Sequence, residues 1–180
     1  MKKRLFLLCT FILSQILFAQ ETTSNEGKFP SDYGVFSIPL WSKVVLELKE
    51  TQESKYEYRI ISMEPYETFY SFDKAEELFD KNPKENTVEL FFIGAYDNEG
   101  KEDKDYNTLL KIRNNLKKPL SYKADIKYYF KDDFENTSVV GAFPGTNTNE
   151  TWPQKIDFIA LYNFENWNMN TELPQNEKNE

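Results

Sequence analysis

The sequence predicts a mainly β fold in which two antiparallel sheets pack as a β-sandwich, with one short helix. Apolar and charged residues alternate with a period of two in several stretches, as in Val44, Leu46 and Leu48. Seven or so such stretches are separated by turn-forming residues, a spacing typical of sandwich proteins. Only residues 71–82 show a clear helical repeat. These three observations together favour a sheet fold over a helical one.

The first 19 residues are predicted to be a cleavable export signal. Three basic residues at positions 2–4 precede a mostly apolar run over 5–19, which is shorter than the ~20 residues that a membrane-spanning helix needs. Ala19 offers the small side chain that a signal peptidase reads, so we expect cleavage after Ala19 and a periplasmic or extracellular location. An uncleaved N-terminal anchor is the alternative. Cys9 lies inside the apolar run and is interpreted as part of the signal.

The rest of the chain is expected to contain one domain. Residues 20–32 are polar and predict a flexible leader, and the Asn- and Glu-rich residues 166–180 predict a polar tail. Residues 33–165 then form a single β-sandwich domain. A processed chain of 161 residues is long enough to bury a stable core without disulfides.

Charge and composition exclude several classes of function. Removal of the signal would leave 19 basic against 30 acidic residues. Such an acidic protein is not expected to bind nucleic acid, and it would meet the membrane only transiently, through the signal. The chain has no His and a single Cys, which excludes His-based triads, His or Cys metal sites and thiol catalysis in the processed form. No cofactor is expected.

A β-hairpin is predicted at the start of the domain. The alternation over 44–48 continues after a polar link, because Tyr56, Tyr58 and Ile60 alternate with Glu57 and Arg59. The intervening residues 50–54 suit a hairpin loop.

Residues 71–82 are predicted to form a helix of about three turns. Asp73 and Glu76 fit a capping box, and Asn82-Pro83 would end the helix. A helix this short is marginal alone, so its apolar stripe must pack on a sheet. The stripe consists of Phe72, Ala75, Leu78 and Phe79.

Two segments, 88–96 and 156–164, are apolar on both faces. Strands of this kind are expected to be central and covered on both sides. Between them, residues 138–143 predict a shorter strand and residues 146–151 a polar loop.

Residues 106–113 and 120–130 predict a further strand pair, framed by Asn114-Asn115 and Pro119. The run LLKIRNNLKKPLSYKADIKYYF, residues 109–130, resembles a hairpin pair of exported immunoglobulin-like domains. The resemblance implies an immunoglobulin-like sandwich, a fold that carries no function by itself.

Three tryptophans, Trp41, Trp152 and Trp167, are the predicted contacts for a glycan or a protein partner. Flat aromatic faces stack on the apolar faces of sugars, and these three lie at presumed strand starts or in the tail. The alternative is that they fill the core, as most aromatic residues here are expected to do.

Two further patterns contain residues that could form a site. The acidic turn 97–105 clusters oxygen ligands of the kind that Ca²⁺ prefers, but it lacks the EF-hand spacing, and a solvated hairpin tip is favoured. Ser71-Phe72-Asp73-Lys74 fits the Ser-x-x-Lys pattern of penicillin-binding proteins, yet a Lys-Thr-Gly partner is absent from the sequence. No catalytic, cofactor or metal site is therefore predicted.

The sequence thus predicts an exported, non-catalytic interaction or binding module of unknown specific role. It would bind a protein, a cell surface or a glycan through loops or a sheet edge. A carbohydrate-binding module is the alternative, and a weak hydrolase that uses paired carboxylates is the third reading.

Overall fold

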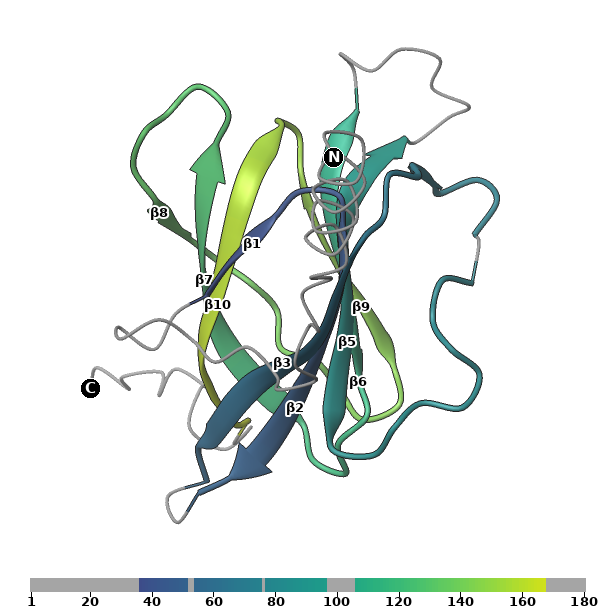
Figure 1. The fold of residues 1–180 in the computed structure, drawn as a ribbon, viewed down its shortest axis with the longest axis vertical. Coiled ribbons are helices and arrows are strands. Elements are labelled where there is room, and N and C mark those ends of the chain that lie inside the picture. The colour runs from purple at the N-terminus through teal and green to yellow at the C-terminus, as the bar shows by residue number, and fades with distance from the viewer. Residues whose placement is uncertain (1–35, 52–53, 76, 97–105, 168–180) are drawn as a thin grey trace, which may run out of the picture.

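The computed structural model describes residues 36–51, 54–75, 77–96 and 106–167. These residues form strands and connecting loops, with no α-helix among them (Figure 1). The predicted signal and leader lie outside the described residues, as does the tail beyond Trp167. The strands are β1 (Phe36–Pro39), β2 (Ser42–Glu50), β3 (Tyr56–Pro65), β4 (Tyr70–Ser71), β5 (Thr87–Tyr96), β6 (Asn107–Asn114), β7 (Leu120–Tyr128), β8 (Glu135–Thr137), β9 (Asn147–Trp152) and β10 (Ile156–Asn166).

The strands form two sheets that face each other. The four-stranded sheet has the order β1-β10-β7-β8, and the six-stranded sheet has the order β3-β2-β5-β6-β9, with β4 beside the end of β5. All neighbouring strands are antiparallel except β4 and β5. The prediction of a mainly β, sandwich-like fold is confirmed at this level.

The main core lies between the two sheets. Leu46, Phe92 and Ile112 of the six-stranded sheet pack in one buried cluster with Ile126 and Ile159 of the four-stranded sheet. Each is almost fully buried, and burial of such a side chain contributes about 1.5–3 kcal/mol. The alternation in the sequence follows from this arrangement, because every second residue of a strand faces the core.

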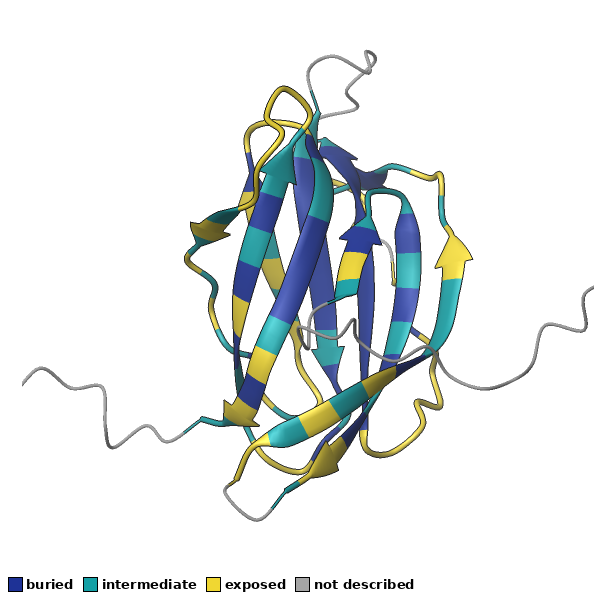
Figure 2. Ribbon diagram, turned by 60° about the vertical axis from the view of Figure 1, so that its left-hand side comes forward, coloured by how far each residue is buried: buried dark blue, intermediate teal, exposed yellow. Residues whose placement is uncertain are grey.

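The predicted hairpin is confirmed, and both apolar segments are central strands. Only β5 is covered on both faces, because the outward residues of β10 are partly exposed. β2 pairs with β3 from Ser42 opposite Pro65 to Glu50 opposite Tyr56. β5 lies between β2 and β6, and β10 lies between β1 and β7. β5 is buried along nearly its whole length on both faces (Figure 2).

The helix predicted over 71–82 is wrong. Tyr70 and Ser71 form β4, and the chain then continues through turns, with a left-handed φ of 45° at Ala75. Phe72 donates its backbone N–H to the Tyr96 carbonyl, and Phe79 packs on Phe91. The apolar residues do reach a sheet as expected, but contacts with its aromatic side chains outweigh the weak helical preference of a short segment.

The predicted pairing of 106–113 with 120–130 is also wrong, although both strands exist. β6 belongs to the six-stranded sheet and β7 to the four-stranded sheet. The Asn114 side chain fixes this crossing: its amide donates to the carbonyls of Lys118 and Ala142, and its oxygen accepts from the Leu116 N–H. A buried amide with three bonds thus directs the chain away from a hairpin.

The assignments of 138–143 and 146–151 are reversed in the structure. Residues 138–141 lie outside any strand, whereas β9 pairs with β6 along the predicted polar loop. β9 is the edge of its sheet, and its outer residues face solvent. An edge strand needs little apolar patterning, which is why the sequence shows none.

Candidate functional site

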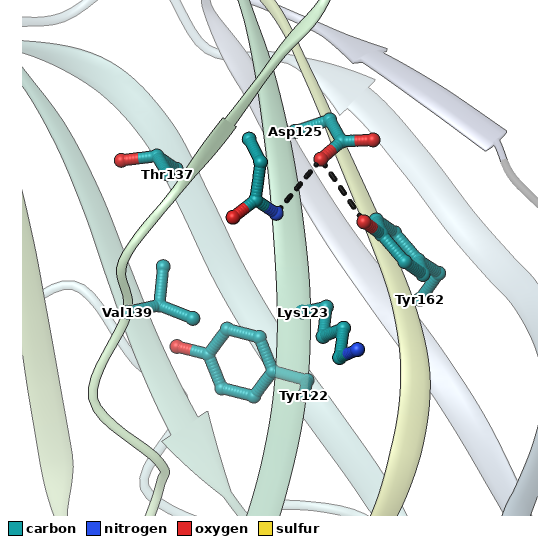
Figure 3. Close-up of a pocket in the computed structure, with 7 residues that line it drawn as sticks. Tyr122, Lys123, Asp125, Thr137, Val139 and Tyr162 are labelled. Carbon is teal, nitrogen blue, oxygen red and sulfur yellow. Dashed lines mark hydrogen bonds between the residues drawn. The ribbon is translucent and has the colours of Figure 1, made fainter.

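A hollow of about 530 Å³ lies at the β8 edge of the four-stranded sheet (Figure 3). Its size is in the range of small-molecule sites. Strands β7, β8 and β10 and the residues after β8 provide its wall. The lining residues are Tyr122, Lys123, Asp125, Asn136, Thr137, Val139 and Tyr162.

The hollow exists because the ladder between β7 and β8 is interrupted. Their last pair is Ala124 opposite Thr137, and the next bridge is Leu120 opposite Ala142. Over this interval β7 advances by four residues and the opposite segment by five. The extra residue breaks the register, as in a β-bulge, so that Tyr122 has no ladder partner on this side.

The residues at the end of β8 and directly after it are hydrogen-bonded to β9 of the six-stranded sheet. The Val140 N–H donates to Oε1 of Glu150 on β9, with the nitrogen and oxygen 2.5 Å apart. The Trp152 indole N–H, also on β9, donates to Oγ1 of Thr137 over 3.1 Å. These two bonds direct the chain toward β9 immediately after Thr137, so that residues 138–140 stay apart from β7 and the hollow remains open.

Tyr122 forms the deep end of the hollow. Its side chain is 7% exposed, and its hydroxyl has no hydrogen-bond partner among the described residues. Figure 3 shows this hydroxyl pointing toward Val139. Burial, with a smaller contribution from the charge of Glu150, raises the pKa of Tyr122, so the phenol stays protonated and can donate.

The outer end of the hollow is a hydrogen-bonded group on the solvent face of the sheet. Oδ1 of Asp125 accepts from the Tyr162 hydroxyl and from the Asn136 amide, each over 3.0 Å (Figure 3). The same Asn136 nitrogen donates to the Ala124 carbonyl. Burial and the bond to Asp125 raise the pKa of Tyr162, which therefore stays a neutral donor.

Residues 129–143, which contain β8 and its flanks, also expose apolar surface. All five large apolar side chains that are widely exposed among the described residues fall in this range. In the sequence they flank the lining residues Asn136–Val139. They are Tyr129, Phe130, Phe134, Val140 and Phe143.

The three predicted tryptophans lie in different surroundings. Trp41 packs edge-on against Phe69 beside the six-stranded sheet, and Trp167 packs against Phe143. Trp152 is 8% exposed, and its bond to Thr137 is the contact that joins it to the lining of the hollow. No ring contact joins two of these tryptophans in the described part of the chain.

Sequence reasoning missed the residues of the hollow. The alternation over 120–130 predicts only that Tyr122 and Asp125 face opposite sides of a strand, and nothing in it marks an unpartnered hydroxyl or a gap between strands. Asn136 lies in β8, which was not predicted as a strand. Its position opposite Asp125 is visible only in the register.

The other two patterns do not develop into sites. The acidic turn 97–105 lies outside the described residues. Ser71 is in β4 with its hydroxyl buried and unpartnered, and Lys74 is exposed, so nothing joins them as a catalytic pair.

Neither the described residues nor comparisons with known proteins point to a metal site, a membrane-spanning helix or a family. Across residues 36–51, 54–75, 77–96 and 106–167 there is no group of three or more His, Cys, Asp or Glu residues that could hold a metal ion. Nor does that part of the chain contain a helix long and apolar enough to cross a membrane. Comparisons with protein-family models, with curated proteins and with solved structures found no match.

Proposed function

We propose that this chain is an exported, non-catalytic binding module that contacts a partner at the cell envelope through residues 129–143. One observation carries the proposal: the widely exposed large apolar side chains of the described chain all lie within residues 129–143, some beyond the end of β7 and Phe143 near its start. Exposed large apolar side chains along one edge of a molecule are typical of interaction surfaces. Loops and sheet edges are also where binding residues are most often found.

The contacts within the β7–β8 turn support this role. The rings of Tyr128 and Phe130 stack with centroids 5.3 Å apart, and Tyr129 packs edge-on against Phe130. The Lys131 ammonium lies over the Tyr128 and Phe130 rings and pairs with Glu135. Rings ordered in this way lose less conformational freedom when a partner binds.

We also propose that the sandwich is of the immunoglobulin-like type. In support, the two sheets share one core, and the chain crosses between them at β1–β2, β6–β7, β8–β9 and β9–β10. The antiparallel pairing of β1 with β10 departs from the usual strand arrangement of that fold. A strand-by-strand comparison with an experimental structure tests this assignment.

Export is tested at the N-terminus. The protein recovered from the periplasm or medium of cells that express the full chain should begin at Gln20 by intact mass. Recovery of the chain only in membranes, with Met1 or the apolar run still attached, would show an uncleaved anchor instead.

Envelope binding is tested with the exported protein and envelopes isolated from its native cells. Saturable co-sedimentation is expected, and the double variant Y129S/F130S should weaken it by about tenfold or more, as loss of central interface aromatics does. E57S, at an exposed position on β3, is the matched control and should bind as the native protein does. Absence of saturable binding, or equal binding by the double variant, would reject the proposal.

A further inference from the structure

We propose that the hollow at the β8 edge binds one sugar unit of an uncharged glycan, with Tyr122 at its deep end and the Asp125–Asn136–Tyr162 group at its mouth. This inference rests on the proposed binding function and names its ligand class.

The deep end holds an unpaired hydrogen-bond donor. The Tyr122 hydroxyl is buried and has no partner among the described residues, which is unfavourable for a polar group. The gap in the ladder leaves only the segment around Val139 between this hydroxyl and the hollow. A ligand oxygen that displaces this segment would accept the phenol proton and give the hydroxyl its partner.

The mouth offers acceptors beside donors. Among the described residues, the two bonds of Asp125 both go to Oδ1, which leaves Oδ2 able to accept. The Asn136 bonds to Ala124 and Asp125 are donated by its amide nitrogen, which leaves the amide oxygen able to accept. Adjacent acceptors of this kind match the neighbouring hydroxyl donors of a sugar ring.

The electrostatics favour an uncharged ligand. A carboxylate or phosphate group would meet the Asp125 carboxylate, and among the described lining residues Lys123 is the one cation. The chain as a whole carries a net charge of −8, which repels anionic polymers over longer distances. A purely apolar ligand would give no partner to the Tyr122 hydroxyl, to Oδ2 of Asp125 or to the Asn136 amide oxygen.

The apolar part of the lining fits the C–H faces of a sugar. The rings of Tyr122 and Tyr162 and the Val139 methyl groups line the same hollow as the polar groups. Aromatic faces beside a few polar atoms can bind a ring that is apolar on its faces and polar at its rim. The hollow therefore assigns sugar contact to tyrosines rather than to the three tryptophans.

The test uses the exported protein and a panel of uncharged oligosaccharides built from glucose, galactose, mannose and N-acetylglucosamine. Saturation-transfer NMR and calorimetry should detect at least one binder. Y122F and D125N should each weaken it by about fivefold or more, since Y122F removes a donor and D125N replaces an acceptor oxygen with an NH2 donor. Y56F is the matched control, because the Tyr56 hydroxyl bonds to Asn166 outside the hollow, and it should bind normally.

Folding and binding are separable in this design. Y122F removes a hydroxyl without a partner, so its free energy of unfolding should equal or exceed that of the native protein. Failure of the whole panel while envelope binding persists would overturn the sugar assignment alone. Failure of both would overturn the proposed function as well. Sugar binding that survives Y122F and D125N but is lost in W41A or W167A would place the site at a tryptophan and reject the hollow.

Discussion

The outer face of the six-stranded sheet and the β8 edge of the four-stranded sheet both carry aromatic residues, yet only the first is covered. The chain after β3 runs back beside β5 and β6 (Figure 1), and its residues Tyr70 and Phe79 form one buried cluster with Phe91, Ile93 and Leu109. In the turn that leads from β7 to β8, no described residue covers Phe130 in this way, and Phe130 is 54% exposed. Aromatic residues alone therefore do not mark a binding surface, because another segment of the same chain can bury them.

The largest expected effect separates the two regions directly. Phe91 is fully buried and packs edge-on against Tyr66 and Phe79, so F91A should lower the free energy of unfolding by about 3–5 kcal/mol. F130A removes the same atoms at an exposed position and should change it by less than about 0.5 kcal/mol. Urea denaturation measures both. Similar losses in the two variants would mean that the turn is as well packed as the covered face.

The next effect concerns a buried ion pair beneath the cover. The Arg113 guanidinium lies 3.0 Å from the Glu89 carboxylate and over the Phe79 ring, and it donates to the Asp80 carbonyl. R113M should cost about 3 kcal/mol, because it leaves the Glu89 charge buried without its partner. The double variant E89L/R113M should recover much of this loss in the same urea measurement. A double variant less stable than R113M would contradict this explanation.

A smaller loss is expected at Gly94. A Cβ atom at this position would lie 2.6 Å from a Phe69 ring carbon and 2.7 Å from one of Trp41, so the two rings must move apart. G94A should therefore cost about 1–3 kcal/mol, as overpacking does. Thermal unfolding followed by tryptophan fluorescence measures this loss of stability. T68A, at an exposed position next to Phe69, is the control. Unchanged stability in G94A would show that the cover is loosely packed.

The smallest expected effect is a pH dependence of stability at Glu150, the residue of β9 that bonds to the segment after β8. Burial raises the pKa of the Glu150 carboxyl above its usual 4.5, and the Val140 N–H partly opposes this. Between the usual and the raised pKa, the Glu150 carboxyl holds a proton in the folded chain that it has released in the unfolded chain. The native protein therefore gains stability as the pH falls through the raised pKa, and this gain is complete at about pH 4.5. The difference between the free energies of unfolding of E150Q and of the native protein should become smaller as the pH is lowered from 7 to 4.5. A difference that grows on acidification would contradict the sign.

The sequence predicted those strands whose residues follow a regular pattern along the chain. β2, β3, β5 and β10 were found because their residues alternate or are apolar on both faces. The polar edge strand β9 and the irregular segment after β4 have no such period. Which sheet a strand joins was likewise out of reach, because the crossing after β6 depends on three bonds of Asn114.

The candidate site could not be predicted for a related reason. It is produced by one additional residue between Thr137 and Ala142 relative to β7, which is a property of two segments together. The sequence of either segment alone contains no sign of it. The exposure of the five side chains could not be predicted either, because the alternation over 120–130 places Phe130 on the same face as the buried Tyr122.

Binding at the β8 edge rather than at the covered face is tested most directly by alkylation of single cysteines. In a Cys9→Ala background, V140C places a thiol at the open edge and E67C places one in the exposed part of the covering loop. The alkylation rate of each exported variant is measured with and without saturating native envelopes. Envelopes should slow the reaction at position 140 severalfold and leave position 67 unchanged. Protection at position 67 with none at position 140 would contradict the assignment of the binding surface.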